Sequence, residues 1–194
     1  MLFYQITPMQ ISHKCIIKSL KKLTIKSWIM TLLNKEPVKR AENSLKQFDP
    51  NLSVIVLESS ARTAAEAATS LGCDVGAIVK SLLFKTENTF ALYLVAGDKK
   101  ASLNKIKKDL NIKDASMASA EEVKDITGYT IGGVSPVGHL KKISVFIDNS
   151  LKRFDHLYAA AGHPNCVFKI NFENLQKITN GSIKDIIEWN NQTY

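Results

Sequence analysis

A lysine interrupts an apolar stretch of the chain that reads Ile78-Val79-Lys80-Ser81-Leu82-Leu83-Phe84. Alternate residues of a β-strand face the same side, so a strand here places Lys80 between Ile78 and Leu82 on an apolar surface. A cation in such a place is costly unless it is paired or points into a wet cleft. Lys80 is therefore either a fixed cation that holds a phosphate, carbonyl or ribose oxygen, or a lysine whose stem covers apolar surface while its head reaches water.

A glycine-rich loop is the second candidate, and it reads Ile131-Gly132-Gly133-Val134-Ser135-Pro136-Val137-Gly138-His139. The backbone N–H groups of such a loop are accessible and can cradle a carbonyl or an oxyanion. The alternative is that two glycines and a proline only turn a corner. The spacing fits neither a P-loop nor a dinucleotide fingerprint, which disfavours an enzyme that uses nucleoside triphosphates. Ser135 lacks the G-x-S-x-G elbow of a nucleophilic serine.

Three further places carry polar residues with possible roles. The turn Gly162-His163-Pro164-Asn165 offers Asn165, whose amide can bond a ligand or the turn's own backbone. His139 and His163 lie in glycine-containing loops, and no nearby Ser/Asp pattern marks either as part of a catalytic triad. Asp148 ends an apolar segment, where an acid either caps a turn or faces a site.

Composition excludes several classes of protein. With 194 residues, 45% of them hydrophobic and 23% charged, the chain is long enough for one domain with its own core. No apolar run approaches the ~18 residues of a membrane span, so no membrane partner is expected. The three cysteines are few and far apart, which fits a reducing compartment and a cytoplasmic location. Neither they nor the four histidines have ligand spacing, so we expect no metal and no cofactor.

The positive charge is concentrated at the amino terminus. Residues 1–33 hold five lysines and no acid; without them the 26 basic and 18 acidic residues of the chain become 21 and 18, a net charge of +3. We therefore divide the chain into a basic arm, 1–33, and a domain, 34–194. The arm resembles an organelle presequence without arginine, or a nucleic-acid-binding arm, or a stretch upstream of a true start at Met30. The mild charge of the domain suits a weakly held polyanion such as tRNA.

Helices and strands are mixed without strict alternation, and several predicted strands are close enough for antiparallel pairing. The patterns therefore predict an α+β domain with a mixed, curved β-sheet flanked by helices. Predicted helices cover 37–48, 63–71, 102–110, 119–128, 172–178 and the tail, and predicted strands cover 52–57, 78–84, 90–96, 143–147, 157–160 and 167–170.

Taken together, these motifs resemble the YbaK/prolyl-tRNA-synthetase-associated editing domain family. The resemblance covers residues 37–188, and its most specific part is the run from Gly128 to Gly138. The other matching pieces, in the same order and spacing, are Val79-Lys80-Ser81-Leu82-Leu83, Ile147-Asp148 and Ala160-Ala161-Gly162 before a strand.

The resemblance implies a trans-acting hydrolase that deacylates mischarged aminoacyl-tRNA, with tRNA-Pro or a related tRNA as substrate and prolyl-tRNA synthetase as a partner. It places the catalytic roles on Lys80, which holds the acceptor end, and on Gly132 and Gly133, which bind the aminoacyl ester. A ribose hydroxyl of the terminal adenosine is implied to assist the water. The residues that would line the substrate site are Ser135, Pro136, Val137, Gly138, His139, Asp148, Gly162, His163, Pro164 and Asn165.

The amino acid removed is expected to be small. The cysteine-specific branch carries a tyrosine where this chain reads Val56-Leu57-Glu58-Ser59, a glutamine at His139 and Gly-Lys-Arg at Gly162-His163-Pro164. These differences disfavour cysteine and favour alanine, serine or another small side chain, with overlapping substrates because a pocket discriminates one methylene by only ~1–3 kcal/mol. The alternatives are a non-catalytic tRNA- or synthetase-binding module of the same fold, and a nucleic-acid binder that acts through the arm.

Overall fold

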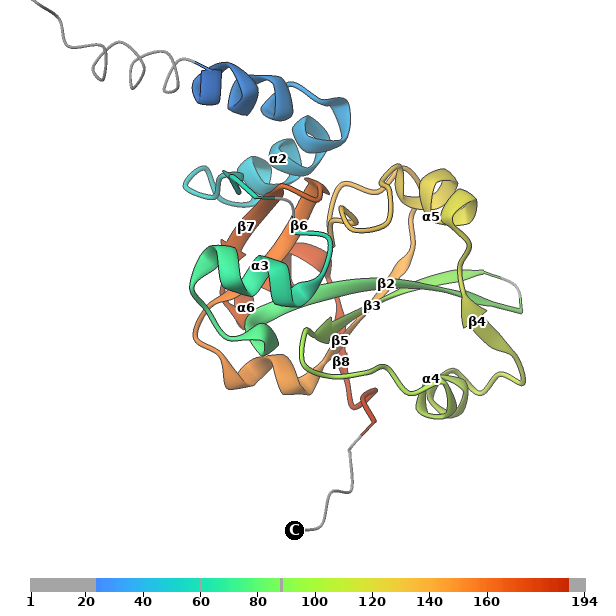
Figure 1. Ribbon diagram of the computed structural model, residues 1–194. Coiled ribbons are helices and arrows are strands. Elements are labelled where there is room, and N and C mark those ends of the chain that lie inside the picture. The colour runs from blue at the N-terminus through green and yellow to red at the C-terminus, as the bar shows by residue number, and fades with distance from the viewer. Residues whose placement is uncertain (1–23, 60, 88, 189–194) are drawn as a thin grey trace, which may run out of the picture.

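The computed structural model describes residues 24–59, 61–87 and 89–188. Within these residues the strands form one mixed sheet of eight strands in the order β1-β7-β6-β2-β3-β5-β8, and β4 pairs with β2 outside this path (Figure 1). Strands β2 and β3, and β6 and β7, are antiparallel neighbours, whereas β2/β6, β3/β5 and β5/β8 are parallel. The predicted α+β class, with a mixed sheet flanked by helices, is confirmed.

The elements have the following bounds. The strands are β1 Ile55–Val56, β2 Ile78–Thr86, β3 Phe90–Ala96, β4 Ala115–Met117, β5 Ser144–Asp148, β6 Leu157–His163, β7 Cys166–Ile170 and β8 Ser182–Lys184. Residues 24–33 are helical. The helices that follow are α2 Glu36–Phe48, α3 Ala64–Leu71, α4 Leu103–Leu110, α5 Ala120–Thr127 and α6 Phe172–Thr179, with 3-10 turns η1 Val75–Ala77 and η2 Asn149–Arg153.

Local chemistry explains where the helices begin and end. Both α3 and α5 start with a capping box, in which Thr63 and Ser119 cap the helix and a glutamate three residues later bonds back to the cap. Both end at a glycine with positive φ, Gly72 and Gly128. Helix α2 carries proline at its start, as the sequence predicts.

The structure corrects the sequence-based elements at three places. The tail that contains Asp185, Glu188 and Trp189 is predicted to be helical, but residues 185–188 are not helical and Ile187 forms a bridge with Ala101. They follow β8, which pairs in parallel with β5; the part from Trp189 onward lies outside the described residues. The strand β4 was not predicted, because three residues are too few to show a periodic pattern. The turn predicted at 161–165 is shorter, since β6 continues to His163.

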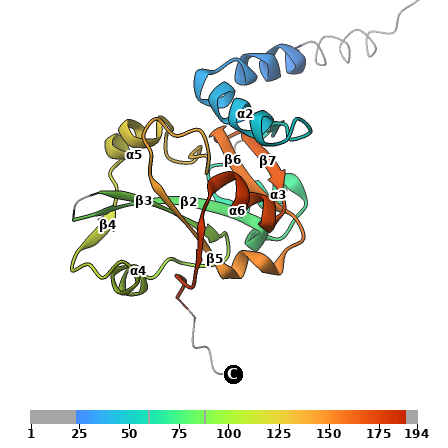
Figure 2. The same ribbon diagram turned by 180° about the vertical axis from the view of Figure 1, so that it is seen from behind.

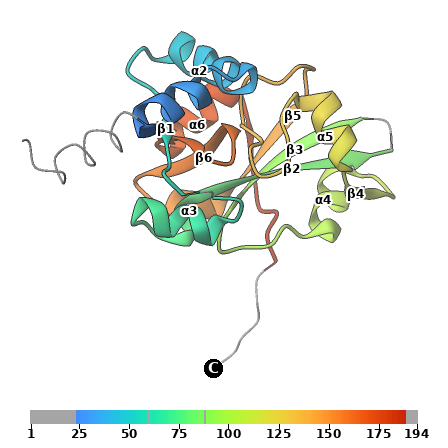
Figure 3. The same ribbon diagram turned by 45° about the horizontal axis from the view of Figure 1, so that its top comes forward.

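The core lies on both faces of the sheet. Helices α3 and α6 lie on opposite faces (Figures 1 and 2), and α2 packs across β6 (Figure 3). The largest cluster of buried side chains includes Val79 and Leu83 of β2. A second cluster on the other face includes Phe84 of β2 and Ile106 of α4. Leu32, just before the predicted domain boundary, is buried in the largest cluster; residues 1–23 of the predicted arm lie outside the described residues.

One glycine allows β6 to approach α2 closely. Gly162 has a φ of +85°, and a Cβ atom added there would lie 2.5 Å from the carbonyl oxygen of Pro37. Gly72, at the end of α3, also has a positive φ of +64°, but a Cβ atom added there meets nothing within 4 Å. A side chain at Gly162 would therefore bring both backbone strain and steric overlap, whereas a side chain at Gly72 would bring only backbone strain.

We predict that Gly162→Ala lowers the free energy of unfolding by about 2–5 kcal/mol, the sum of left-handed strain and overpacking. Gly72→Ala is the matched control, and we expect it to lower the free energy of unfolding only by the backbone strain, about 1–2 kcal/mol. Urea unfolding of both variants beside the wild type measures the two losses. Equal losses would show that β6 and α2 can move apart without cost.

Candidate active site

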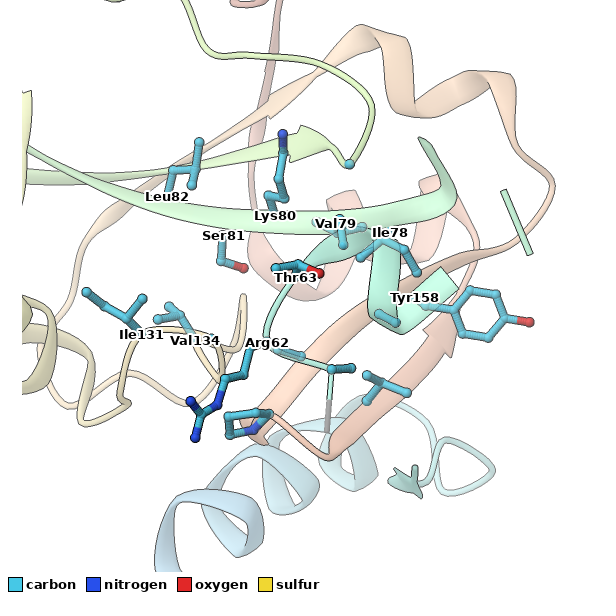
Figure 4. A pocket seen from close by; sticks show the side chains of 18 of the residues that line it. Arg62, Thr63, Ile78, Val79, Lys80, Ser81, Leu82, Ile131, Val134 and Tyr158 are labelled. Carbon is cyan, nitrogen blue, oxygen red and sulfur yellow. The ribbon is translucent and has the colours of Figure 1, made fainter. Parts of the chain in front are cut away.

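A cavity of about 530 Å³ lies along one edge of β2 (Figure 4). Its walls come from segments far apart in the sequence: the loop before α3, the glycine-rich loop, the end of β6 and the start of α5. The residues that line it include Arg62, Thr63, Lys80, Ser81, Gly132 and Pro164.

The cavity exists because the edge of β2 is covered in two separate pieces. Strand β6 pairs only with Ile78 and Val79. Strand β4 pairs with Phe84 to Thr86, and Ala118 N–H donates to the carbonyl of Leu83 at 3.0 Å. Between these two pieces no strand of the described residues covers the edge.

The pairing with β3 determines which backbone groups reach the open edge. Thr86 N–H donates to the carbonyl of Thr89 at 2.8 Å and closes the hairpin with β3. In an antiparallel ladder successive residues direct their backbone groups to alternate edges, so Lys80 and Leu82 bond to β3 and Ser81 does not. The N–H and C=O of Ser81 therefore face the gap between β6 and β4. The outward carbonyl of Leu83 agrees with this alternation.

Ser81 also brings a side-chain oxygen to the cavity. Its Oγ is buried and has no hydrogen-bond partner among the described residues. Figure 4 shows the Ser81 side chain on the side of β2 that faces Ile131 and Val134 of the glycine-rich loop. An unpartnered buried hydroxyl in an apolar wall is unfavourable unless a ligand or water completes it.

Lys80 points the other way. Its side chain leaves the face of β2 opposite to Ser81 (Figure 4), and its Nζ donates to the carbonyl of Lys99. Burial lowers the pKa of Lys80; the negative charge of Asp98 opposes this shift, and Lys100 adds to it. The sequence placed Lys80 correctly beside Ile78 and Leu82. The resemblance implies that Lys80 and the diglycine hold the same acceptor end, but the ammonium and the glycine-rich loop lie on opposite faces of β2.

The two adjacent glycines have different surroundings. Gly132 lines the cavity with a φ of +89°, and its N–H has no hydrogen-bond partner within the described residues. The N–H of Gly133 donates to the carbonyl of Thr130 at 2.9 Å, and a Cβ atom there would lie 2.9 Å from the backbone of His163. Only Gly132 thus has a backbone donor left for a ligand, while Gly133 closes the turn and allows close packing.

The rest of the loop holds its shape and does not line the cavity. This holds for Ser135, Pro136, Val137, Gly138 and His139. Arg40 of α2 donates from Nε to the carbonyl of Gly138 at 2.6 Å, and Tyr129 donates its hydroxyl to the carbonyl of Val137 at 2.8 Å. The Nε2 of His139 lies 2.8 Å from the carbonyl of Ser135, which can only accept, so this nitrogen carries the proton.

The other predicted residues also divide into those that line the cavity and those that hold a neighbouring segment in place. Pro164 lines the cavity. Gly162 and His163 are not part of its lining, and their backbone lies against Gly133. Asn165 holds the neighbouring segment: its Nδ2 donates to the carbonyl of Leu57 at 3.2 Å, and Leu57 N–H donates back to Asn165 at 2.7 Å. Asp148 does not line this cavity; its carboxylate accepts the N–H groups of Ser150 and Ile186.

Most residues of the cavity lining were not among the sequence candidates, and the polar ones include Arg62, Thr63 and Ser81. Ser81 stands beside Lys80, and Arg62 precedes a recognisable capping box, but only the tertiary structure brings these segments together. Arg62 and Lys80 are the charged residues among those described that line the cavity. The site therefore favours a ligand with anionic or oxygen-rich groups.

Among the described residues, no group of three or more His, Cys, Asp or Glu side chains could hold a metal ion. None of the helices in this part of the chain has the length and apolar character needed to cross a bilayer.

Comparison with known proteins agrees with this arrangement. The sequence matches the family described as "Aminoacyl-tRNA editing domain" over residues 58–178. The uncharacterized protein YwhH of Bacillus subtilis (strain 168) is 32% identical over 143 residues, 73% of this chain and 90% of that protein. A crystal structure reported as "a putative trans-editing enzyme for prolyl tRNA synthetase" matches with a TM-score of 0.76 and 34% identity, over 80% of this chain and 99% of that chain.

A larger enzyme shares the same domain. The proline–tRNA ligase of Caldicellulosiruptor bescii is 32% identical over 126 residues, which make up 65% of this chain and 21% of the ligase. The similarity therefore concerns one region of the ligase, whereas it extends over nearly the whole of the two smaller relatives.

The buried ring of His139 makes stability depend on pH. Burial lowers the pKa of His139 below 6.5, and the nearby charge of Arg40 adds to this, although the bond to Ser135 opposes it. The unfolded chain thus binds a proton more readily than the folded one, so stability is complete above pH 6.5 and falls as the pH decreases through the lowered folded pKa.

We predict that His139→Gln reduces this acid dependence by up to about 1.4 kcal/mol per pH unit. Urea unfolding between pH 8 and pH 5 measures the slope for wild type and variant. The same substitution at the exposed His156 is the matched control. A wild-type slope in His139→Gln would contradict the role assigned to the buried ring.

Proposed function

This chain belongs to the aminoacyl-tRNA editing domain family, and we propose that it is a trans-acting deacylase that removes a wrongly attached small amino acid from tRNA. In the reaction a water oxygen bonds to the ester carbonyl carbon, and the bond from that carbon to the ribose oxygen breaks. The ribose oxygen keeps the electron pair and takes up a proton, which releases the amino acid and an intact tRNA.

The observation that carries this proposal is the cavity beside the open edge of β2. It combines apolar walls with the backbone N–H groups of Ser81 and Gly132, for which the described residues provide no partner. An aminoacyl ester is already activated, so orienting the water and polarising the carbonyl can suffice. One well-placed donor to the developing oxyanion contributes on the order of 3 kcal/mol.

We assign the roles as follows. The N–H of Gly132 donates to the ester carbonyl, and Gly133 fixes the turn that presents it. The ammonium of Lys80, on the other face of β2, binds a phosphate or ribose oxygen of the acceptor end after leaving the carbonyl of Lys99. The segments 135–139 and 162–165 form the frame that holds Gly132 and Pro164 in place.

The relatives support the choice of tRNA and partner. One is reported as "a putative trans-editing enzyme for prolyl tRNA synthetase", and another is a proline–tRNA ligase that matches this chain over 21% of its length. We therefore propose tRNA-Pro or a related tRNA as substrate, prolyl-tRNA synthetase as a partner and the cytoplasm as the location.

We predict that Lys80→Ala lowers kcat/KM for the preferred mischarged tRNA by about 10- to 100-fold, the loss of one charge-assisted hydrogen bond. A panel of mischarged tRNAs identifies the preferred substrate, and the fold of the variant is checked by its unfolding curve. Lys85→Ala is the matched control, because Lys85 lies on the same strand but pairs at 2.7 Å with Glu122 outside the cavity.

Undiminished turnover in Lys80→Ala would reject the role of Lys80. If the wild-type protein bound these tRNAs and released no amino acid from any of them, it would be the non-catalytic binding module instead.

A further inference from the structure

Ser81 presents three polar groups to the cavity, and none of them has a partner in the described part of the chain. Its N–H and C=O lie on the part of the β2 edge that neither β6 nor β4 covers. Its Oγ is buried without a hydrogen bond. The neighbouring walls, Ile131 and Val134, offer no polar side chain in exchange. Such a concentration of open groups on one residue is expected where a ligand completes them.

The length of the opening limits what can bind there. Pairing with β6 stops at Val79, and the bond from Ala118 restores the ladder at Leu83. Only one residue with outward backbone groups lies between them. A peptide strand needs several such residues for its ladder, so the edge suits a ligand that has a single donor and acceptor pair.

An aminoacyl group has that pair. Its α-amino group and its carbonyl are attached to one carbon, as the N–H and C=O are in a residue of a strand. Two residues that face each other in an antiparallel ladder can exchange both hydrogen bonds. We propose that Ser81 recognises the aminoacyl group of the substrate in this way: its C=O accepts from the α-amino group, its N–H donates to the ester carbonyl, and its Oγ accepts a second α-amino hydrogen.

This inference rests on the proposed function and assigns the recognition of the α-amino group within the same site. It also explains how one site can accept several small amino acids. The atoms that Ser81 contacts are common to all of them, and the side chain is left to the apolar walls. The ammonium of Lys80 cannot serve this purpose, since it is a donor and lies on the other face of β2.

The experiment compares two esters that differ only in the α-amino group, alanyl-tRNA and propionyl-tRNA, with the tRNA that the deacylation panel prefers. Each enzymatic rate is divided by the uncatalysed rate of the same ester, because the amino group itself activates the ester. We expect the wild-type protein to prefer the alanyl ester in kcat/KM by about tenfold or more, the effect of losing hydrogen bonds to an amino group.

Variants at Ser81 then test the hydroxyl. Ser81→Ala should lower kcat/KM for the alanyl ester by about tenfold and leave the propionyl ester nearly unchanged, and Ser81→Thr, which keeps the hydroxyl, should retain the wild-type preference. A merely structural role would lower both rates together. Unfolding curves confirm that each variant is folded.

Equal corrected rates for the two esters in the wild-type protein would overturn the inference while leaving the deacylase intact. An unchanged preference in Ser81→Ala would overturn the part assigned to Oγ. If the wild-type protein hydrolysed neither ester, nor any other in the panel, the proposed function would fail and this inference with it.

Discussion

The candidate site depends on a break in the pairing of β2. A central strand normally has partners along both edges, and its backbone groups are then satisfied throughout. Here β6 leaves β2 after Val79, because its own register shifts between Ala160 and His163 and Gly162 turns it against the start of α2. Strand β4 covers the edge again only from Phe84. The sheet thus provides unpaired backbone groups inside an apolar wall. A strand holds these groups more rigidly than a loop would.

Helix α2 controls both sides of this opening. Its first turn packs against Gly162 so closely that no side chain fits between them. One turn further along, Arg40 donates to the carbonyl groups of Gly138, inside the glycine-rich loop, and of Gly128, just before it. Its guanidinium carbon lies 4.6 Å from the centre of the Tyr129 ring. The segments 135–139 and 162–165 are therefore held by the same helix. Their side chains act on the site by fixing the backbone of Gly132 and the ring of Pro164.

The distribution of charge fits an editing reaction. Both charged residues of the described cavity wall, Arg62 and Lys80, are basic, and the side chain of Lys80 leaves the face of β2 opposite to Ser81. A phosphate backbone would neutralise them, while the ester would meet neutral donors. The chemistry then depends on backbone geometry, which accounts for the lack of a triad pattern in the sequence.

Local signals in the sequence predicted most of the elements and the motifs, whereas the packing of distant segments decided which of their groups meet. Capping boxes, glycine ends and apolar periodicity are local signals, so α3, α5 and the long hairpin of β2 and β3 were predictable, and so was the side of the strand that Lys80 shares with Ile78. The face of β2 that the glycine-rich loop covers was not predictable, because alternation gives two equivalent faces and only long-range packing chooses between them. For the same reason Ser81, one residue from the predicted lysine, could be recognised only after β6 and β4 had been placed.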